Sequence, residues 1–317
     1  MKGRARYAAG RLLLAVPTLF GLSFLAFALG TVAGNPSSKI AEAGLPPGVD
    51  PTPAQINAVS RRLGFNKPLV VRYGIWLRSA LHGDFGRSLL THESVTGQIR
   101  AALPSTTELA LVAVAMILAL CLPLALAGAH WRGRWFQQVL RVGELSGSSV
   151  PSFFLAYLLI YALSVKIKFF PVTGQSGWKS IILPAMTLAV GPTALVARLL
   201  QTSLVDVLGE DYVRTARSKG LADFRILVRH ALRNAALPVL TVLGSILAGL
   251  IEGAVVVELI FGRSGIGALT LQSVGSADYP MIQGVILFAG LVVVAFNLAV
   301  DLLYPIIDAR VRLGARA

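Results

Sequence analysis

The side chains that could carry out catalysis or bind a metal are few and widely spaced in this chain. Its one cysteine, Cys121, sits in an apolar run, and its four histidines lie far apart without the spacing of metal ligands: His82, His92, His130 and His230. A lone cysteine allows no internal disulfide and no cysteine-based metal site. The sequence also lacks a His-Glu-x-x-His zinc motif and the Gly-rich loop that cradles ATP phosphates. We therefore expect no metal site, no cofactor and no ATP-binding site.

Two serines in an apolar stretch, Ser146 and Ser148, raise the question of an intramembrane protease. Such an enzyme needs a histidine from another membrane helix to activate the serine hydroxyl. Every histidine here falls outside an apolar run or at its edge. The sequence therefore predicts a protein that is not an enzyme.

Acidic residues within long apolar stretches are the more informative polar groups, and five lie in or near such stretches: Glu108, Glu144, Glu252, Glu258 and Asp301. An acid at membrane depth costs a few kcal/mol and normally faces a helix-bundle interior or a water-filled cavity. The first two fall near the ends of their runs, where solvation at the interface accounts for them. Asp301 is a candidate to pair within a bundle, with Arg198 as its partner. The last three are candidates to line a path through the membrane.

The elements that must position these acids are long apolar helices. The chain of 317 residues is 55% hydrophobic and only 14% charged, with a mean hydropathy of +0.71. Soluble proteins carry about 25% charged residues, so composition indicates a membrane protein. Six runs reach the ~20 apolar residues that a membrane-spanning helix needs: 12–32, 103–129, 145–165, 181–200, 237–261 and 281–307.

The first run follows four basic residues, a pattern that also describes a secretory signal peptide: Lys2, Arg4, Arg6 and Arg11. The run is too long for the apolar segment of a signal peptide, and no small-residue cleavage site follows it. We therefore expect an uncleaved membrane anchor.

The Lys and Arg residues between the runs predict the orientation. Seventeen lie at the N-terminus, in the 130–141 loop, in the segment from Arg198 to Arg233 and in the tail, whereas the opposite short loops hold four: Lys166, Lys168, Lys179 and Arg263. Basic residues concentrate on the cytoplasmic side, so we expect both termini in the cytoplasm. The same pattern explains the net charge of +14. Nucleic-acid binding would instead need a basic face on a soluble fold, and we expect no such partner.

Two segments between the runs are too long to be simple connections. The outer one, 34–102, carries helical patterns around Ile56 and Val71 and is expected to form a small periplasmic or extracellular cap. The inner one, 201–236, contains a pattern typical of a short capped helix over 209–220. Acids begin this helix and basic residues end it, which complements the helix dipole.

Further signals define this inner segment. Gly220 stands where a helix ends in a left-handed residue. Tyr212, Val213 and Ala216 form a small apolar stripe, and a second helix is expected to start near Asp223 as its N-cap and to end before Pro238. A helix of this kind lies either on lipid headgroups or in a groove on a cytoplasmic partner, and periodicity does not separate the two.

The segment 211–238 resembles the coupling loop, or EAA loop, of type I ABC importer permeases, in the version found in the dipeptide/oligopeptide/nickel family. It reads Asp-Tyr-Val-Arg-Thr-Ala-Arg-Ser-Lys-Gly-Leu over 211–221, and keeps the family's Ala216 and Gly220 but not its Glu, since Arg214 and Thr215 precede the alanine. Further matches to the first permease of such pairs follow in order, at 63–68, 83–86, 103–109, 257–261, 278–280 and 297–302. Small departures, such as Gly34-Asn35-Pro36 where an Asp is usual, leave the substrate class open.

The resemblance implies an all-α inner-membrane protein with six transmembrane helices and the type I (MetI-like) permease fold, with a large outer loop after the first helix. It implies residues 1–33 as N-terminus and first helix, 34–102 as outer region, 103–307 as permease domain and 308–317 as cytoplasmic tail. The coupling-loop residues are implied to dock on ATPase subunits: Asp211, Tyr212, Val213, Arg214, Thr215, Ala216, Gly220 and Leu221. The implied partners are a second homologous permease, two ATP-binding subunits, an extracytoplasmic substrate-binding protein and membrane lipid.

The resemblance also bears on the acids and on the cargo. Glu258 occupies a family position, and we expect it to pair within the structure. Glu252 stands where a small residue is usual, so it either faces the path and favours cationic or amine-bearing cargo, or contacts the second permease. Peptides are the expected cargo, with glutathione, nickel or a metallophore as alternatives in the same family. A secondary transporter is the alternative of a different class, although the sequence shows no internal repeat.

Overall fold

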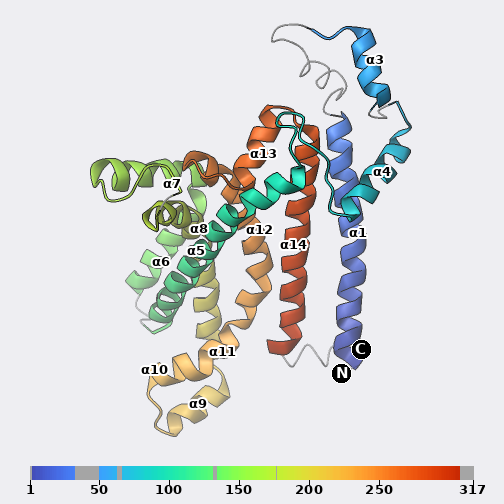
Figure 1. Cartoon of the computed structure of the whole chain (residues 1–317). Coiled ribbons are helices and arrows are strands. Elements are labelled where there is room, and N and C mark those ends of the chain that lie inside the picture. The colour runs from blue at the N-terminus through green and yellow to red at the C-terminus, as the bar shows by residue number, and fades with distance from the viewer. Residues whose placement is uncertain (1, 33–49, 63–65, 131–133, 176, 308–317) are drawn as a thin grey trace. The chain divides into compact units, whose positions relative to one another are not determined.

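The computed structural model describes residues 2–32, 50–62, 66–130, 134–175 and 177–307. Over this part of the chain every regular element is helical, apart from an isolated bridge between Arg87 and Ser94, which confirms the predicted all-α class. The helices are α1 (Lys2–Val32), α3 (Pro53–Arg62), α4 (Leu69–Leu81), α5 (Val95–His130), α6 (Arg134–Ser149), α7 (Ser152–Leu159), α8 (Lys179–Val207), α9 (Asp211–Ser218), α10 (Asp223–Ile226), α11 (Leu232–Ala235), α12 (Leu237–Ile260), α13 (Ile266–Gly275) and α14 (Tyr279–Ile307), with π-helical turns η1 (Ile160–Lys166) and η2 (Leu227–Ala231) (Figure 1).

The predicted membrane runs correspond to long helices, with differences in detail. Among the described residues three helices are long and apolar enough to cross a membrane, at Val95–His130, Lys179–Val207 and Tyr279–Val300. They contain the second and fourth predicted runs and most of the sixth. The fifth run forms α12, whose side chains are described only in part, and the apolar part of α1 that is described, Leu13–Leu29, is shorter than a full span. Six transmembrane helices therefore remain a prediction.

The third predicted run is not one straight helix. It breaks after α6, and the axes of Arg141–Gly147 and Ser152–Lys166 meet at 101°. Pro151 directly precedes α7 as its N-cap and has no N–H to continue the earlier ladder of hydrogen bonds. Gly147 and Ser149 just before it weaken the end of α6 further, as expected where helices kink sharply.

The chain divides into two compact units. The first consists of Thr106–Arg263 with the segments Met1–Ala8 and Phe296–Ala317. Its central helix is α8, which packs against α6, α7, α11 and α12. Because of these contacts, 61% of the most apolar stretch of α8 is buried, against 28% in α5. Within this unit α9 and α10 lie at one end of α8 and α7 at the other (Figure 1).

The second unit consists of Ala9–Ser105 and Ser264–Ala295. In it α4 lies against α1 through Tyr73, whose ring contacts Phe20, Phe24 and Phe27 and whose hydroxyl is hydrogen-bonded to Ser23 at 2.7 Å. In the N-terminal half of α14, a Cβ at Gly284 would lie only 2.5 Å from Val95 Cγ1, so the packing there leaves no space for a side chain.

One buried carboxylate organises the start of α14. Asp278 is the N-cap residue, and its Oδ1 accepts hydrogen bonds from the backbone N–H groups of Leu89, at 3.1 Å, and Met281, at 3.4 Å. The Ser88 hydroxyl donates to its other oxygen. These bonds satisfy donors at the helix start and tie the segment that precedes α5 to α14.

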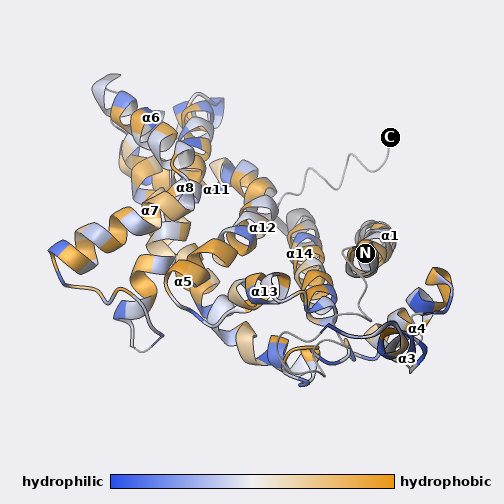
Figure 2. Ribbon diagram, turned by 90° about the horizontal axis from the view of Figure 1, so that it is seen from above, coloured by the Kyte–Doolittle hydropathy of each residue, from blue (hydrophilic) through white to orange (hydrophobic). Residues whose placement is uncertain are grey.

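Many helix surfaces in both units remain apolar and uncovered. Seen from above, the ribbons of α5, α7 and α12 are coloured hydrophobic over much of their length (Figure 2). Leu111, Phe153 and Tyr157, for example, are each more than half exposed. Helices that are apolar all round are expected where lipid or further apolar helices surround them, which agrees with the membrane class.

Candidate functional site

The predicted helix in the inner segment is present as α9. It begins at Asp211, one residue after the extended N-cap Glu210, so only one of the two acids lies in the first turn. Thr215 bonds back to the Asp211 carbonyl at 3.1 Å, and Arg214 forms an exposed ion pair with Asp211 at 3.7 Å. Surface pairs of this kind add little stability. Both side chains of the pair are therefore available to a partner.

The C-terminal end of α9 follows the prediction closely. Gly220 has a φ of +79°, and its N–H donates to the Arg217 carbonyl at 2.9 Å. The N–H of Leu221 donates to the Ala216 carbonyl at 3.3 Å. This pair of hydrogen bonds is the Schellman arrangement, in which the left-handed residue is usually glycine because a Cβ would be strained there.

The apolar stripe of α9 packs inward. Val213 is fully buried in the core of the first unit, and Ala216 and Leu221 pack against the same core. Tyr212 is 41% exposed, and its hydroxyl accepts a hydrogen bond from Asn234 at 3.0 Å. The helix is therefore fixed to the rest of its unit by its apolar side, and any docking must use the opposite, polar side.

The second helix of this segment differs from the prediction in its N-cap. The N-cap of α10 is Ala222, and Asp223 is its first residue. The Asp223 carboxylate instead accepts a hydrogen bond from Arg217 Nε at 3.0 Å. This ion pair joins α9 to α10, and the neighbouring Phe224 is left 63% exposed at the tip of the segment.

Glu252 lies on an uncovered face of α12. The buried face of this helix includes Leu250 and Ala254, and Glu252 is two residues from each, about 200° around the helix. Ser245, Gly249 and Glu252 are all exposed and follow one another at helical spacing. We call these three residues the α12 stripe. A Cβ at Gly249 would meet nothing within 4 Å.

Glu258 lies on the buried side of the same helix. It is fully buried, and its Oε1 accepts a hydrogen bond from the Thr106 hydroxyl at 2.6 Å. Arg263, which the charge pattern placed in a short loop on the outer side, is only 2% exposed and donates to Glu108 at 3.0 Å. The Glu108 side chain is therefore partly exposed, as expected near the end of its run, and is also held by an ion pair with Arg263.

The sequence analysis expected Glu258 to pair but named no partner, and it did not foresee the ion pair of Glu108 with Arg263. The two α5 partners, Thr106 and Glu108, belong to one matched motif, at 103–109, which was the only signal that they act together. The side chains of Glu144 and Asp301 lie outside the described part of the chain. The predicted pairing of Asp301 with Arg198 stays a prediction.

Comparison with known proteins identifies the family. A family model described as the inner membrane component of binding-protein-dependent transport systems matches residues 119–313. The chain is 38% identical over 307 residues to a Brucella abortus (strain 2308) protein named as a peptide transport system permease, covering 94% of this chain and 96% of the relative. It is 36% identical over 307 residues to the glutathione transport system permease protein of Escherichia coli (strain K12), covering 96% and 98%. The chain therefore belongs to the family of inner membrane components of binding-protein-dependent transport systems.

Proposed function

We propose that this permease forms one half of the translocation pathway of an ABC importer for peptides, together with a second, homologous permease. The proposal rests on the family and on the α12 stripe. A membrane helix that exposes Glu252 beside Ser245 and Gly249 cannot leave that face to lipid at low cost, because an acid at membrane depth needs water or a protein partner. A second permease packed over the stripe would supply the protein partner, and a polar path between the two helix bundles would supply the water.

Two separate ATPase subunits drive the importer in this proposal, and α9 with α10 is their docking site. The exposed side of α9 offers Asp211, Arg214 and Thr215, and α10 adds the exposed ring of Phe224. Helices of this kind bind a partner by placing side chains at helical spacing into a groove. Because Val213 fixes α9 to the core, movement of the ATPases would pass to the membrane helices as a rigid displacement.

The orientation follows from the same docking site. If the ATPases are cytoplasmic, α9 and α10 face the cytoplasm, which is the side that the distribution of Lys and Arg predicts. Both termini then lie in the cytoplasm, and the extracytoplasmic binding protein delivers cargo at the opposite face.

Peptides are the proposed cargo because one relative is named for peptide transport and another for glutathione transport. Glutathione is itself a small peptide, and it is the second candidate. Peptides carry a free ammonium group, and Glu252 on the uncovered stripe provides a carboxylate that such a group can approach.

The assay is uptake of labelled dipeptides into proteoliposomes that hold the complete importer and its binding protein. Glu252→Gln should reduce uptake of a lysine-containing dipeptide by about tenfold, which is ~1.4 kcal/mol, and should change uptake of a neutral dipeptide much less. Glu93→Gln, at an exposed acid far along the sequence from the stripe, is the matched control and should behave as wild type. Equal uptake of the cationic dipeptide by Glu252→Gln and wild type would remove Glu252 from the pathway.

A further inference from the structure

The helix α4 of the second unit contacts α1 well inside the predicted membrane run 12–32, although the segment of α4 was expected to form an outer cap (Figure 1). Tyr73 of α4 packs against three phenylalanine rings of α1 and is hydrogen-bonded to Ser23 at 2.7 Å. Ser23 lies about 14 Å along the helix from the end of that run at Val32. The two helices therefore meet within the run and not beyond it.

The same stretch of α1 packs against α14. Gln283 of α14 donates a hydrogen bond to the Phe27 carbonyl at 3.3 Å, and the Leu22 side chain occupies the space where a Cβ at Gly290 would lie. Both α14 residues belong to Tyr279–Val300, which is long and apolar enough to cross a membrane. Because Ser23 falls between Leu22 and Phe27, the contact with α4 lies at the depth of this span.

The side of α4 that turns away from α1 is apolar as well. Val71 and Ile75 are each two residues from Tyr73, about 200° around the helix, so they lie nearly opposite it. Both are about half exposed, and Val70 and Leu81 are 78% exposed. We call these four residues the α4 apolar face. A helix on the surface of a water-soluble cap would carry polar side chains there.

The charged side chains of α4 are both basic. The helix contains Arg72 and Arg78 and no acid. Arg78 is exposed and lies beside Val71, because seven residues are almost two full turns. A long arginine side chain can keep its stem among apolar groups while its guanidinium stays at the membrane surface. Phosphate oxygens in the headgroup layer accept charge-assisted hydrogen bonds from it.

We propose that α4 is embedded in the phospholipid leaflet on the side of the membrane where α14 begins. The α4 apolar face contacts acyl chains, and Arg78 reaches the headgroup phosphates. The 13 residues of α4 span about 20 Å, too little to cross a core of about 30 Å, so the helix stays within one leaflet. In the predicted orientation this is the outer leaflet. The proposal needs only that α14 crosses the membrane, and it does not depend on the ATPases or the cargo.

Protein partners fit the α4 apolar face less well than lipid does. A water-soluble binding protein approaches from outside the membrane, whereas the Tyr73 contact lies beside the span of α14. A helix of the second permease can reach this depth, but it would bury Arg78 and would need an acid opposite the guanidinium. A phospholipid supplies apolar chains and an anionic group in one molecule.

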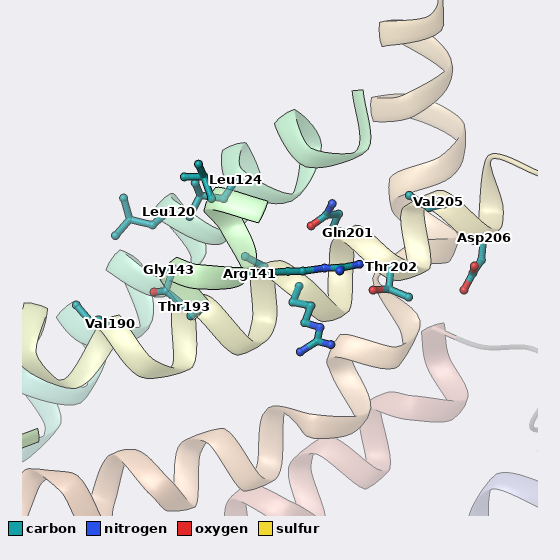
Figure 3. Close-up of a pocket in the computed structure, with 14 residues that line it drawn as sticks. Leu120, Leu124, Arg141, Gly143, Val190, Thr193, Gln201, Thr202, Val205 and Asp206 are labelled. Carbon is teal, nitrogen blue, oxygen red and sulfur yellow. The ribbon is translucent and has the colours of Figure 1, made fainter. Parts of the chain in front are cut away.

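The α4 apolar face is an open surface and shares no residue with the cavity of the first unit. That cavity of about 540 Å³ lies between α5, α6 and α8 (Figure 3). None of the described residues that line it belongs to α1, α4 or α14. A ligand held in the cavity would therefore not account for the apolar residues of α4.

The test uses a nitroxide spin label at Ile75→Cys, in a Cys121→Ala background, within the complete importer in lipid nanodiscs and with cysteine-free partner subunits. Collisions of the label with oxygen, which concentrates in lipid, are compared with collisions with a water-soluble nickel chelate. We expect the label at Ile75 to meet oxygen more often than the chelate. Asn57→Cys, on the exposed polar side of α3, is the matched control and should show the reverse.

Two outcomes would overturn the proposal. More frequent collisions with the nickel chelate at Ile75 would place the α4 apolar face in water. Infrequent collisions with both reagents would show that the second permease or the binding protein covers it.

The contact of Arg78 with phosphate is tested on the same label. Arg78→Lys should keep the preference for oxygen, because a lysine also reaches the headgroup phosphates. Arg78→Glu should lower that preference, because phosphate repels a carboxylate and an acid among acyl chains is costly. If the two variants give the same ratio of oxygen to nickel collisions, Arg78 does not hold α4 at the headgroups.

Discussion

Gly220 is the position where a single substitution tests the proposed coupling most selectively. Its φ of +79° ends α9 in the left-handed region, and a Cβ built there would meet nothing within 4 Å. A side chain at this position therefore clashes with no neighbour, and its whole effect is strain in its own backbone. That strain is about 1–2 kcal/mol for an ordinary L-residue and is greatest for a β-branched one.

The expected consequence of Gly220→Val is loss of the fixed end of α9. A strain of 1–2 kcal/mol lowers the ratio of ordered to disordered helix ends by roughly 5- to 30-fold. Val213 would still hold the middle of the helix in the core, so the protein should remain in the membrane. The ATPases should then hydrolyse ATP with little transport, because movement at the docking site no longer reaches the membrane helices as a rigid displacement.

The assay compares ATP hydrolysis and peptide uptake in the same proteoliposomes. Gly220→Asn should retain most coupling, because asparagine tolerates the left-handed region better than other residues. Gly83 provides the matched control, since its φ of +78° and its open surroundings are nearly the same. Gly83→Val introduces the same strain in the predicted outer segment and should leave coupling intact. If Gly220→Val couples ATP hydrolysis to peptide uptake as well as Gly83→Val does, the role assigned to α9 is refuted.

Three further substitutions test other parts of the structure. Gly284→Ala places a methyl 2.5 Å from Val95 Cγ1 and should destabilise the protein by about 1–3 kcal/mol. Its midpoint of thermal unfolding should be lower than that of the control Gly275→Ala, because a Cβ at Gly275 would meet nothing within 4 Å. Phe224→Ser should weaken copurification of the ATPase subunits without changing that midpoint, because the ring is largely exposed. Glu258→Leu removes a fully buried carboxylate that accepts a hydrogen bond from the Thr106 hydroxyl and should lower the midpoint, by about 1–3 kcal/mol of stability.

Features set by local chemistry could be predicted from the sequence. Gly220 was expected in a left-handed conformation because it follows a helical pattern that ends in basic residues, and the structure shows that conformation, with a φ of +79°. The helical class and the positions of the long apolar helices also follow from composition and run length. Neither depends on which residues meet across the fold.

Features set by distant contacts could not be predicted. Asp223 has the chemistry of an N-cap, but Arg217 offers its carboxylate an ion pair instead. Arg263 reads as a loop charge in sequence, yet its partner Glu108 is 155 residues away. The bend at Pro151 was also missed, because membrane helices tolerate a proline where neighbouring groups satisfy the freed backbone.

The most direct test of the proposed function is the energy source of uptake. Proteoliposomes that hold the two permeases, the ATPases and the binding protein should accumulate a labelled dipeptide only when ATP is hydrolysed. Collapse of the proton gradient should leave that uptake unchanged. Uptake that continues without ATP hydrolysis and stops when the gradient collapses would contradict the proposal and indicate a secondary transporter.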